Sequence, residues 1–228
     1  MILKLSILIL VVCLIIIIYY QYSVQKGLPR LYYINLEHRK DRKTHILRQL
    51  KKIDYPQSHI HRIDAIKHDN GATGCGLSHI KALELAQKTH KNKRDYIIIL
   101  EDDFTWIHDK NQTLKTLTHA LNVSDWNVIL LACNGTTSGA DNKYVRKVNK
   151  CQTTSGYIIR IGYIPKLLKI WKKDMLHRQS TKKYIPDTCI DMSWKKIQHE
   201  DWYITNPKLG YQIESYSDIE NRKVNYHV

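Results

Sequence analysis

Short apolar runs alternate with helical patterns along most of the chain, and they predict its elements in order. Apolar runs typical of strands lie at 31–36, 59–66, 96–100, 126–132 and 156–161. Apolar residues at helical spacing predict one helix around Ile46, Leu47, Leu50 and Ile53, and further helices at 77–86, 113–121 and 163–175. The glycine-containing stretch 71–76 and the stretch 134–150 are predicted to be loops. This alternation predicts an α/β fold with a mostly parallel central sheet.

The amino-terminal segment differs from the rest because residues 5–20 are apolar and carry no charge. It predicts an uncleaved signal-anchor over 1–24, then a short stalk at 25–30 and one domain at 31–228. A cleaved signal peptide is the competing interpretation. Basic residues after the span favour a cytoplasmic domain, whereas the sequons at Asn111, Asn122 and Asn134 favour a lumenal one. We expect a single-pass membrane protein with a lumenal domain, the cytoplasmic face being the alternative.

The charge and the cysteine pattern limit which partners and metals are expected. The net charge of +15 is spread over basic doublets throughout the domain, which suits a membrane surface or anionic substrates and argues against a nucleic-acid partner. The cysteines lack zinc-ligand spacing, so a structural zinc is not expected. Cys133 and Cys151 flank the predicted loop 134–150 and can close it with a disulfide, although other pairings among the four cysteines outside the span stay open.

Three adjacent carboxylates, Glu101, Asp102 and Asp103, directly follow the apolar run 96–100. Ligands bind in open α/β sheets at the carboxyl ends of the strands. Neighbouring carboxylates raise one another's pKa unless a cation lies among them. The triplet therefore predicts a divalent metal chelated by a nucleotide diphosphate, and a solvated acidic loop is the plainer alternative.

Other segments carry weaker signals. Arg39 and Arg42 follow the first predicted strand and open a helix, which is a suitable place for a pyrophosphate, although capping by Asp41 explains part of the pattern. Ser78 and His79 begin the next predicted helix, after a pair of glycines. Carboxylates in the last quarter, taken singly, are ordinary surface groups.

The order of these segments resembles glycosyltransferase family 25, which includes bacterial lipooligosaccharide β-galactosyltransferases and procollagen-type galactosyltransferases. The matching motifs are Tyr33-Ile34-Asn35-Leu36-x-x-Arg39-x-x-Arg42, Gly74-Cys75-x-x-Ser78-His79, Ile99-Leu100-Glu101-Asp102-Asp103, Thr154-x-Gly156-Tyr157, Pro207, Gln212 and Ser217-Asp218-Ile219. The resemblance spans about residues 31 to 220. It implies a Rossmann-like, glycosyltransferase A-type domain that transfers a hexose, most typically galactose, from a UDP-sugar with inversion.

The resemblance also implies roles for individual residues. Asp103 and Asp218 would hold Mn²⁺ or Mg²⁺, and the general base would come from Asp187, Asp191 or His79. The donor would be bound by Asn35, Arg39, Arg42, Ser78, Glu101, Asp102 and Gly156. The acceptor would be a hydroxyl of a glycan, glycolipid or protein. Two other classes remain open: a metal-dependent phosphoryl-transfer or hydrolytic enzyme, and a non-catalytic, membrane-tethered glycan-binding relative.

Overall fold

The computed structural model describes residues 6, 9–16, 27–140, 142–181, 185–217 and 222–224. Most of the predicted signal-anchor lies outside these ranges, as do residues 25–26 of the stalk and Asp218. Within the described ranges, no helix has the length and apolar character needed to cross a membrane.

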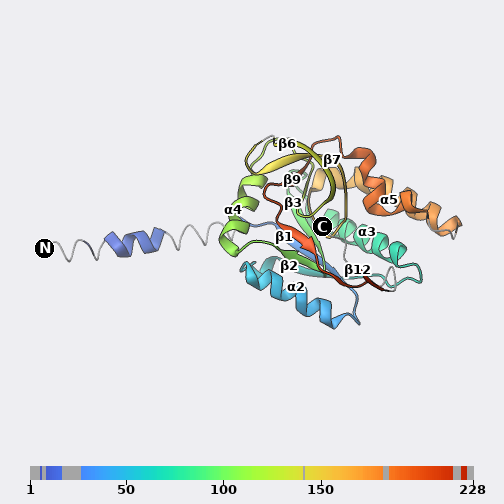
Figure 1. Cartoon of the computed structure of the whole chain (residues 1–228), viewed down its shortest axis with the longest axis horizontal. Helices are drawn as coiled ribbons and strands as arrows, with labels where there is room; N and C mark the ends of the chain where they lie inside the picture. The colour runs from blue at the N-terminus through green and yellow to red at the C-terminus, as the bar shows by residue number, and fades with distance from the viewer. Residues whose placement is uncertain are drawn as a thin grey trace.

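An eight-stranded mixed sheet forms the centre of the domain (Figure 1). Its strands, in spatial order, are β2 (Ile60–Asp64), β1 (Arg30–Asn35), β3 (Tyr96–Glu101), β8 (Gly156–Arg160), β5 (Val128–Leu130), β9 (Trp202–Thr205), β7 (Val145–Gln152) and β6 (Asn134–Ala140). Strands β8 and β7 run antiparallel to their neighbours, while the other strands share one direction. The predicted α/β fold with a mostly parallel sheet is thus confirmed.

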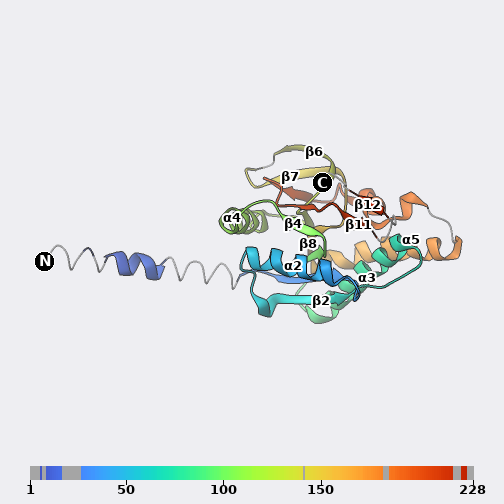
Figure 2. The ribbon, with the colours of Figure 1, turned by 60° about the horizontal axis from the view of Figure 1, so that its bottom comes forward.

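Helices cover both faces of this sheet (Figures 1 and 2). Helices α2 (Lys40–Lys52) and α4 (Lys110–Leu121) pack on one face, and α3 (Gly71–Thr89) and α5 (Ile164–Thr181) on the other. Alternate residues of β3 enter opposite cores, since Ile98 packs with the α2 side and Ile99 with the α3 side. An unbroken apolar strand is what such two-sided burial requires. Helix α5 also begins as predicted, with Pro165 in its first turn.

The shorter elements lie mainly in the carboxyl-terminal half. Strand β4 (Phe104–Trp106) pairs with β10 (Gly210–Gln212), and β11 (Ser215–Ser217) pairs with β12 (Arg222–Val224). The remaining helical turns are η1 (Gln57–His59), η2 (Ile161–Tyr163), η3 (Pro186–Thr188), α6 (Ile190–Ser193) and η4 (Trp194–Ile197). The pairing of β4 with β10 places Gly210–Gln212 beside the residues that follow β3.

The prediction of a loop at 71–76 is wrong, because these residues form the first turns of α3. The side chain of Asn70 caps the helix by accepting a hydrogen bond from the Thr73 backbone N–H at 2.9 Å. A β-carbon on Gly74 would lie 2.6 Å from the Ile66 carbonyl oxygen, and one on Gly76 would lie 2.7 Å from the Met175 sulfur. Both glycines therefore allow close packing of the helix rather than a turn.

The prediction of a surface loop at 134–150 is also wrong, because the segment forms the β6–β7 hairpin at one edge of the sheet. Its outward residues are polar because an edge strand is covered on fewer sides. Cys133 and Cys151 form a disulfide across the base of the hairpin, which is the pairing considered from the sequence.

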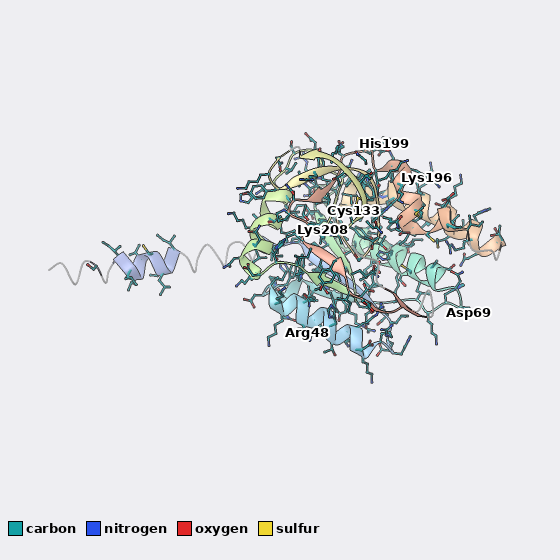
Figure 3. The ribbon with its side chains drawn as sticks, in the orientation of Figure 1. Arg48, Asp69, Cys133, Lys196, His199 and Lys208 are labelled. Carbon is teal, nitrogen blue, oxygen red and sulfur yellow. A yellow bond between two sulfur atoms is a disulfide. The ribbon has the colours of Figure 1, made fainter. Side chains whose placement is uncertain are left out.

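Basic side chains extend from several sides of the domain. Arg48 and Lys196, for example, lie on opposite sides of the view in Figure 3. This distribution agrees with the sequence-based expectation of dispersed charge rather than one basic groove.

Candidate functional site

The acidic triplet lies at the carboxyl end of β3, next to the end of β1, and its side chains enter different surroundings. Asp103 is 1% exposed. Its Oδ2 accepts a hydrogen bond from Gln212 Nε2 at 2.9 Å and lies 2.9 Å from Arg42 Nη1. Its Oδ1 is buried and has no hydrogen-bond partner among the described residues. Such an atom costs free energy unless a ligand or ion pairs with it, so Asp103 marks a candidate metal-ligand position.

Arg42, in the first turn of α2, is the cation closest to the triplet. Its Nη1 lies 3.2 Å from Asp102 Oδ1 and 2.9 Å from Asp103 Oδ2. Burial raises the pKa of Asp103 to about 7, with Glu101 and Asp102 adding to the rise and Arg42 opposing it. One guanidinium therefore offsets the clustered negative charge only in part.

Asn35 connects the end of β1 to the triplet. Its Nδ2 donates to Asp102 Oδ2 at 2.7 Å and to the Arg39 carbonyl oxygen at 3.1 Å. Arg39 itself pairs with Asp41 at 2.9 Å, and hydrogen bonding from Arg39 lowers the pKa of Asp41 to about 2. The structure thus brings together Asn35, Arg42 and the triplet, and it directs Arg39 toward the first turn of α2.

Glu101 contacts α3 and the residues just before β8. Its Oε1 accepts a hydrogen bond from Thr154 Oγ1 at 2.6 Å and lies 3.2 Å from His79 Nε2. Burial opposes ionisation, but the hydrogen bonds from His79 and Thr154 lower the pKa of Glu101. Opposite shifts for Glu101 and Asp103 are the kind of separation that assigns different chemical roles to neighbouring carboxyl groups.

The predicted general bases differ in their surroundings. Asp191 is partly buried in α6, and its Oδ2 accepts a hydrogen bond from the Thr153 backbone N–H at 3.4 Å. Burial raises the pKa of Asp191, and the charge of Glu101 adds to the rise. Asp187 is exposed in η3. Asp191 therefore lies in the electrostatic environment of the triplet.

Thr153 adds strain to the same region. Its φ of 79° lies in the left-handed range, which a β-branched residue rarely adopts. Its Oγ1 donates to Gln212 Oε1 at 3.4 Å, while its backbone N–H serves Asp191. Strained residues of this kind cluster at functional sites.

Two predicted donor-binding residues have structural roles here. Ser78 is buried; its hydroxyl donates to the Gly74 carbonyl at 2.6 Å and accepts from the Ile66 backbone N–H at 2.8 Å. Gly156 begins β8, and a β-carbon there would lie 2.5 Å from the Phe104 ring. Neither contact joins them to the triplet, so their donor-binding roles stay predictions.

Sequence reasoning gave no role to several residues of the site. Thr154 and Gln212 occur in the motifs quoted above, but only the fold shows that they hold Glu101 and Asp103. Tyr157 lies behind His79, with its hydroxyl 3.1 Å from His79 Nδ1. Since these partners come from distant parts of the chain, spacing alone does not reveal them.

No family model and no curated protein matches the chain. Among solved structures, the glycosyltransferase GlyE of Streptococcus pneumoniae TIGR4 is similar at 8% identity with a TM-score of 0.45, covering 78% of this chain and 45% of that one. The mannose-1-phosphate geranyltransferase of Thermus thermophilus is similar at 8% identity with a TM-score of 0.45, covering 78% and 73%. A glycosyltransferase involved in glycosylation of the major capsid of PBCV-1 is similar at 8% identity with a TM-score of 0.39, covering 78% and 94%.

This chain therefore spans less than half the length of the GlyE structure. Likeness at this level identifies neither a family nor a reaction. What the fold and the site define by themselves is an α/β domain with a buried cluster of carboxylates at the carboxyl edge of its sheet.

Proposed function

We propose that the protein is a metal-dependent glycosyltransferase that moves a hexose, with galactose as the first candidate, from a UDP-sugar to a hydroxyl acceptor. The observation that carries this proposal is the buried Asp103 carboxylate, whose Oδ1 has no partner among the described residues. It lies where β1 and β3 end, the position at which α/β sheets bind nucleotides. The motif order that resembles glycosyltransferase family 25 supports the same reaction.

The residues at Asp103 fit a hard divalent cation. Mg²⁺ and Mn²⁺ prefer oxygen ligands and are commonly held by one or two carboxylates together with substrate phosphates. Asp103 Oδ1 is available as such a ligand, whereas both Asp102 oxygens are engaged by Asn35 and Arg42. When bound, Mn²⁺ or Mg²⁺ would offset the charge that develops on the leaving diphosphate.

The amino-terminal end of α2 supports binding of the donor diphosphate. This helix begins at Lys40, directly after β1, so its first backbone N–H groups and positive dipole end are suited to an anion. Arg42 lies in the same turn and already contacts the triplet. We expect it to hold the diphosphate end of the donor, with Arg39 next to it.

Asp191 is the proposed general base. The acceptor oxygen would attack the anomeric carbon as the bond from that carbon to the diphosphate breaks and UDP leaves, which inverts the anomeric centre. The hydroxyl proton would pass to Asp191, whose pKa is raised by burial, which makes its carboxylate a stronger base. His79 is fully buried with both ring nitrogens facing partners, so we assign it the positioning of Glu101.

The location and acceptor follow as further parts of the proposal. The Cys133–Cys151 disulfide supports an oxidising compartment, in line with a lumenal domain on an amino-terminal signal-anchor. A glycan, glycolipid or protein passing through that compartment would then be the acceptor.

The proposal is tested by incubating the purified full chain with a panel of UDP-sugars and with Mn²⁺, Mg²⁺ or EDTA. We expect UDP release that requires the metal, increases with a hydroxyl acceptor and is lost in Asp103→Asn. The matched control is Asp69→Asn, an exposed carboxylate (Figure 3), which should keep full activity. Full activity in EDTA, or release of inorganic phosphate in place of UDP, would refute the transferase.

A further inference from the structure

A second cluster of possible metal ligands shares Glu101 with the acidic triplet. Cys75 Sγ, one ring nitrogen of His79 and one Glu101 carboxylate oxygen all lie within 4.8 Å of one another. Cys75 and His79 are four residues apart on α3, so one helix face presents both. Glu101 reaches them from the end of β3. Among the described residues, this is the one group of three His, Cys, Asp or Glu side chains close enough to share an ion.

The surroundings of these side chains resemble those of a metal site. His79 Nε2 faces Glu101, while Nδ1 lies 3.1 Å from the hydroxyl of the fully buried Tyr157. A metal-bound histidine usually holds its other ring nitrogen in such a hydrogen bond, which fixes the tautomer and the ring orientation. Thr154 orients the carboxylate by donating to Glu101 Oε1 at 2.6 Å.

We propose that Cys75, His79 and Glu101 bind a thiophilic divalent cation, with Zn²⁺ as the first candidate. Thiolate, imidazole and carboxylate are all zinc ligands, with bonds of about 2.0–2.3 Å. The separation of 3.2 Å between His79 Nε2 and Glu101 Oε1 already suits two ligands on one such ion. The thiolate selects Zn²⁺ over Mg²⁺ and Mn²⁺, which prefer oxygen. Three protein ligands leave a fourth position for water or a bound molecule.

This proposed zinc site is separate from the metal site proposed at Asp103, although each uses one carboxylate of the triplet. Asp103 offers only oxygen and faces Arg42 and Gln212, whereas Cys75 and His79 lie on α3. The two proposals therefore make different predictions: Asp103→Asn should remove the Mn²⁺ response and leave Zn²⁺ binding intact, and Cys75→Ser should abolish Zn²⁺ binding.

The test uses the purified, metal-free full chain titrated with Co²⁺, whose thiolate bond gives a charge-transfer absorption band, and then with Zn²⁺ in competition. We expect one equivalent of Co²⁺ to bind with this band and to be displaced by Zn²⁺. The band should be lost in Cys75→Ser. It should persist in Cys13→Ser, which removes an exposed cysteine, and in Asp103→Asn. Tyr157→Phe, which removes the hydroxyl beside Nδ1, should weaken binding by about 10- to 100-fold.

Folding of each variant is checked by circular dichroism. Cys75→Ala serves as a second thiol-free variant if the serine variant does not fold. The absence of a charge-transfer band in the folded wild-type protein would overturn the proposal. A band of full strength in a folded Cys75 variant would overturn it as well, because the thiolate bond would then come from another residue.

Discussion

Replacing Asp103 by Asn should stabilise the metal-free protein, and the gain should increase with pH. The pKa of Asp103 rises from its ordinary value of 3.8 to about 7 in the folded protein. Between these two values the folded state binds more protons than the unfolded state, so stability falls as pH rises through this window. Asn carries no charge at any pH and is free of this cost. The shift of about 3 units corresponds to about 4 kcal/mol when Asp103 is fully ionised.

The expected gain for Asp103→Asn is therefore about 2 kcal/mol near pH 5 and about 4 kcal/mol near pH 8. Urea unfolding of the full chain in EDTA at both pH values measures it, with Asp69→Asn as the exposed control. Mn²⁺ at 100 times its Kd should reverse the order near pH 5 and narrow the difference to about 1 kcal/mol near pH 8, since an ion bound only by the folded wild-type protein adds about 2.7 kcal/mol at that concentration. A stability difference that does not change with pH would refute the reasoning.

Three further changes test other parts of the site. Arg42→Ala should destabilise the protein by about 3–5 kcal/mol in urea unfolding, because it leaves buried carboxylates unpaired. It should also weaken UDP binding tenfold or more in calorimetry. Unchanged stability and unchanged UDP affinity would show that Arg42 neither pairs with the carboxylates nor binds the donor. Asp191→Asn should lower kcat by about 10²–10⁴-fold while Asp187→Asn leaves it near wild type, and equal effects in a steady-state assay would reject Asp191 as the base. Replacing Cys133 and Cys151 together by Ser should cost about 3 kcal/mol in urea unfolding, and an unchanged midpoint would show that the disulfide adds no stability.

The sequence predicted the centre of the fold well because its signals there are local. The run 96–100 is apolar at every position, and only a strand buried on both faces needs such a run. The end of that strand then fixed the place of Glu101, Asp102 and Asp103. The position of the acidic triplet at the end of β3 could thus be predicted before its partners were known.

Predictions from the sequence were wrong where the role of a residue depends on contacts with distant parts of the chain. Gly74 and Gly76 suggested a loop, but they are in a helix because Ile66 and Met175 leave no room for a β-carbon. The 134–150 stretch suggested a loop because its polar residues lie on an edge hairpin. The different surroundings of Glu101 and Asp103 also depend on such distant partners. The sequence alone therefore does not predict that the pKa values of these two carboxyl groups shift in opposite directions.

The pairing of β4 with β10 has a consequence for how the protein is made. The Phe104 ring lies against Gly210, and Gln212 donates to Asp103 across 109 positions of sequence. During synthesis the acidic triplet leaves the ribosome long before either partner, so nascent chains must carry it without Gln212 until almost the whole domain has emerged. Chains that stop before β10 would lack both the packing of Gly210 on the Phe104 ring and the hydrogen bond from Gln212 to Asp103.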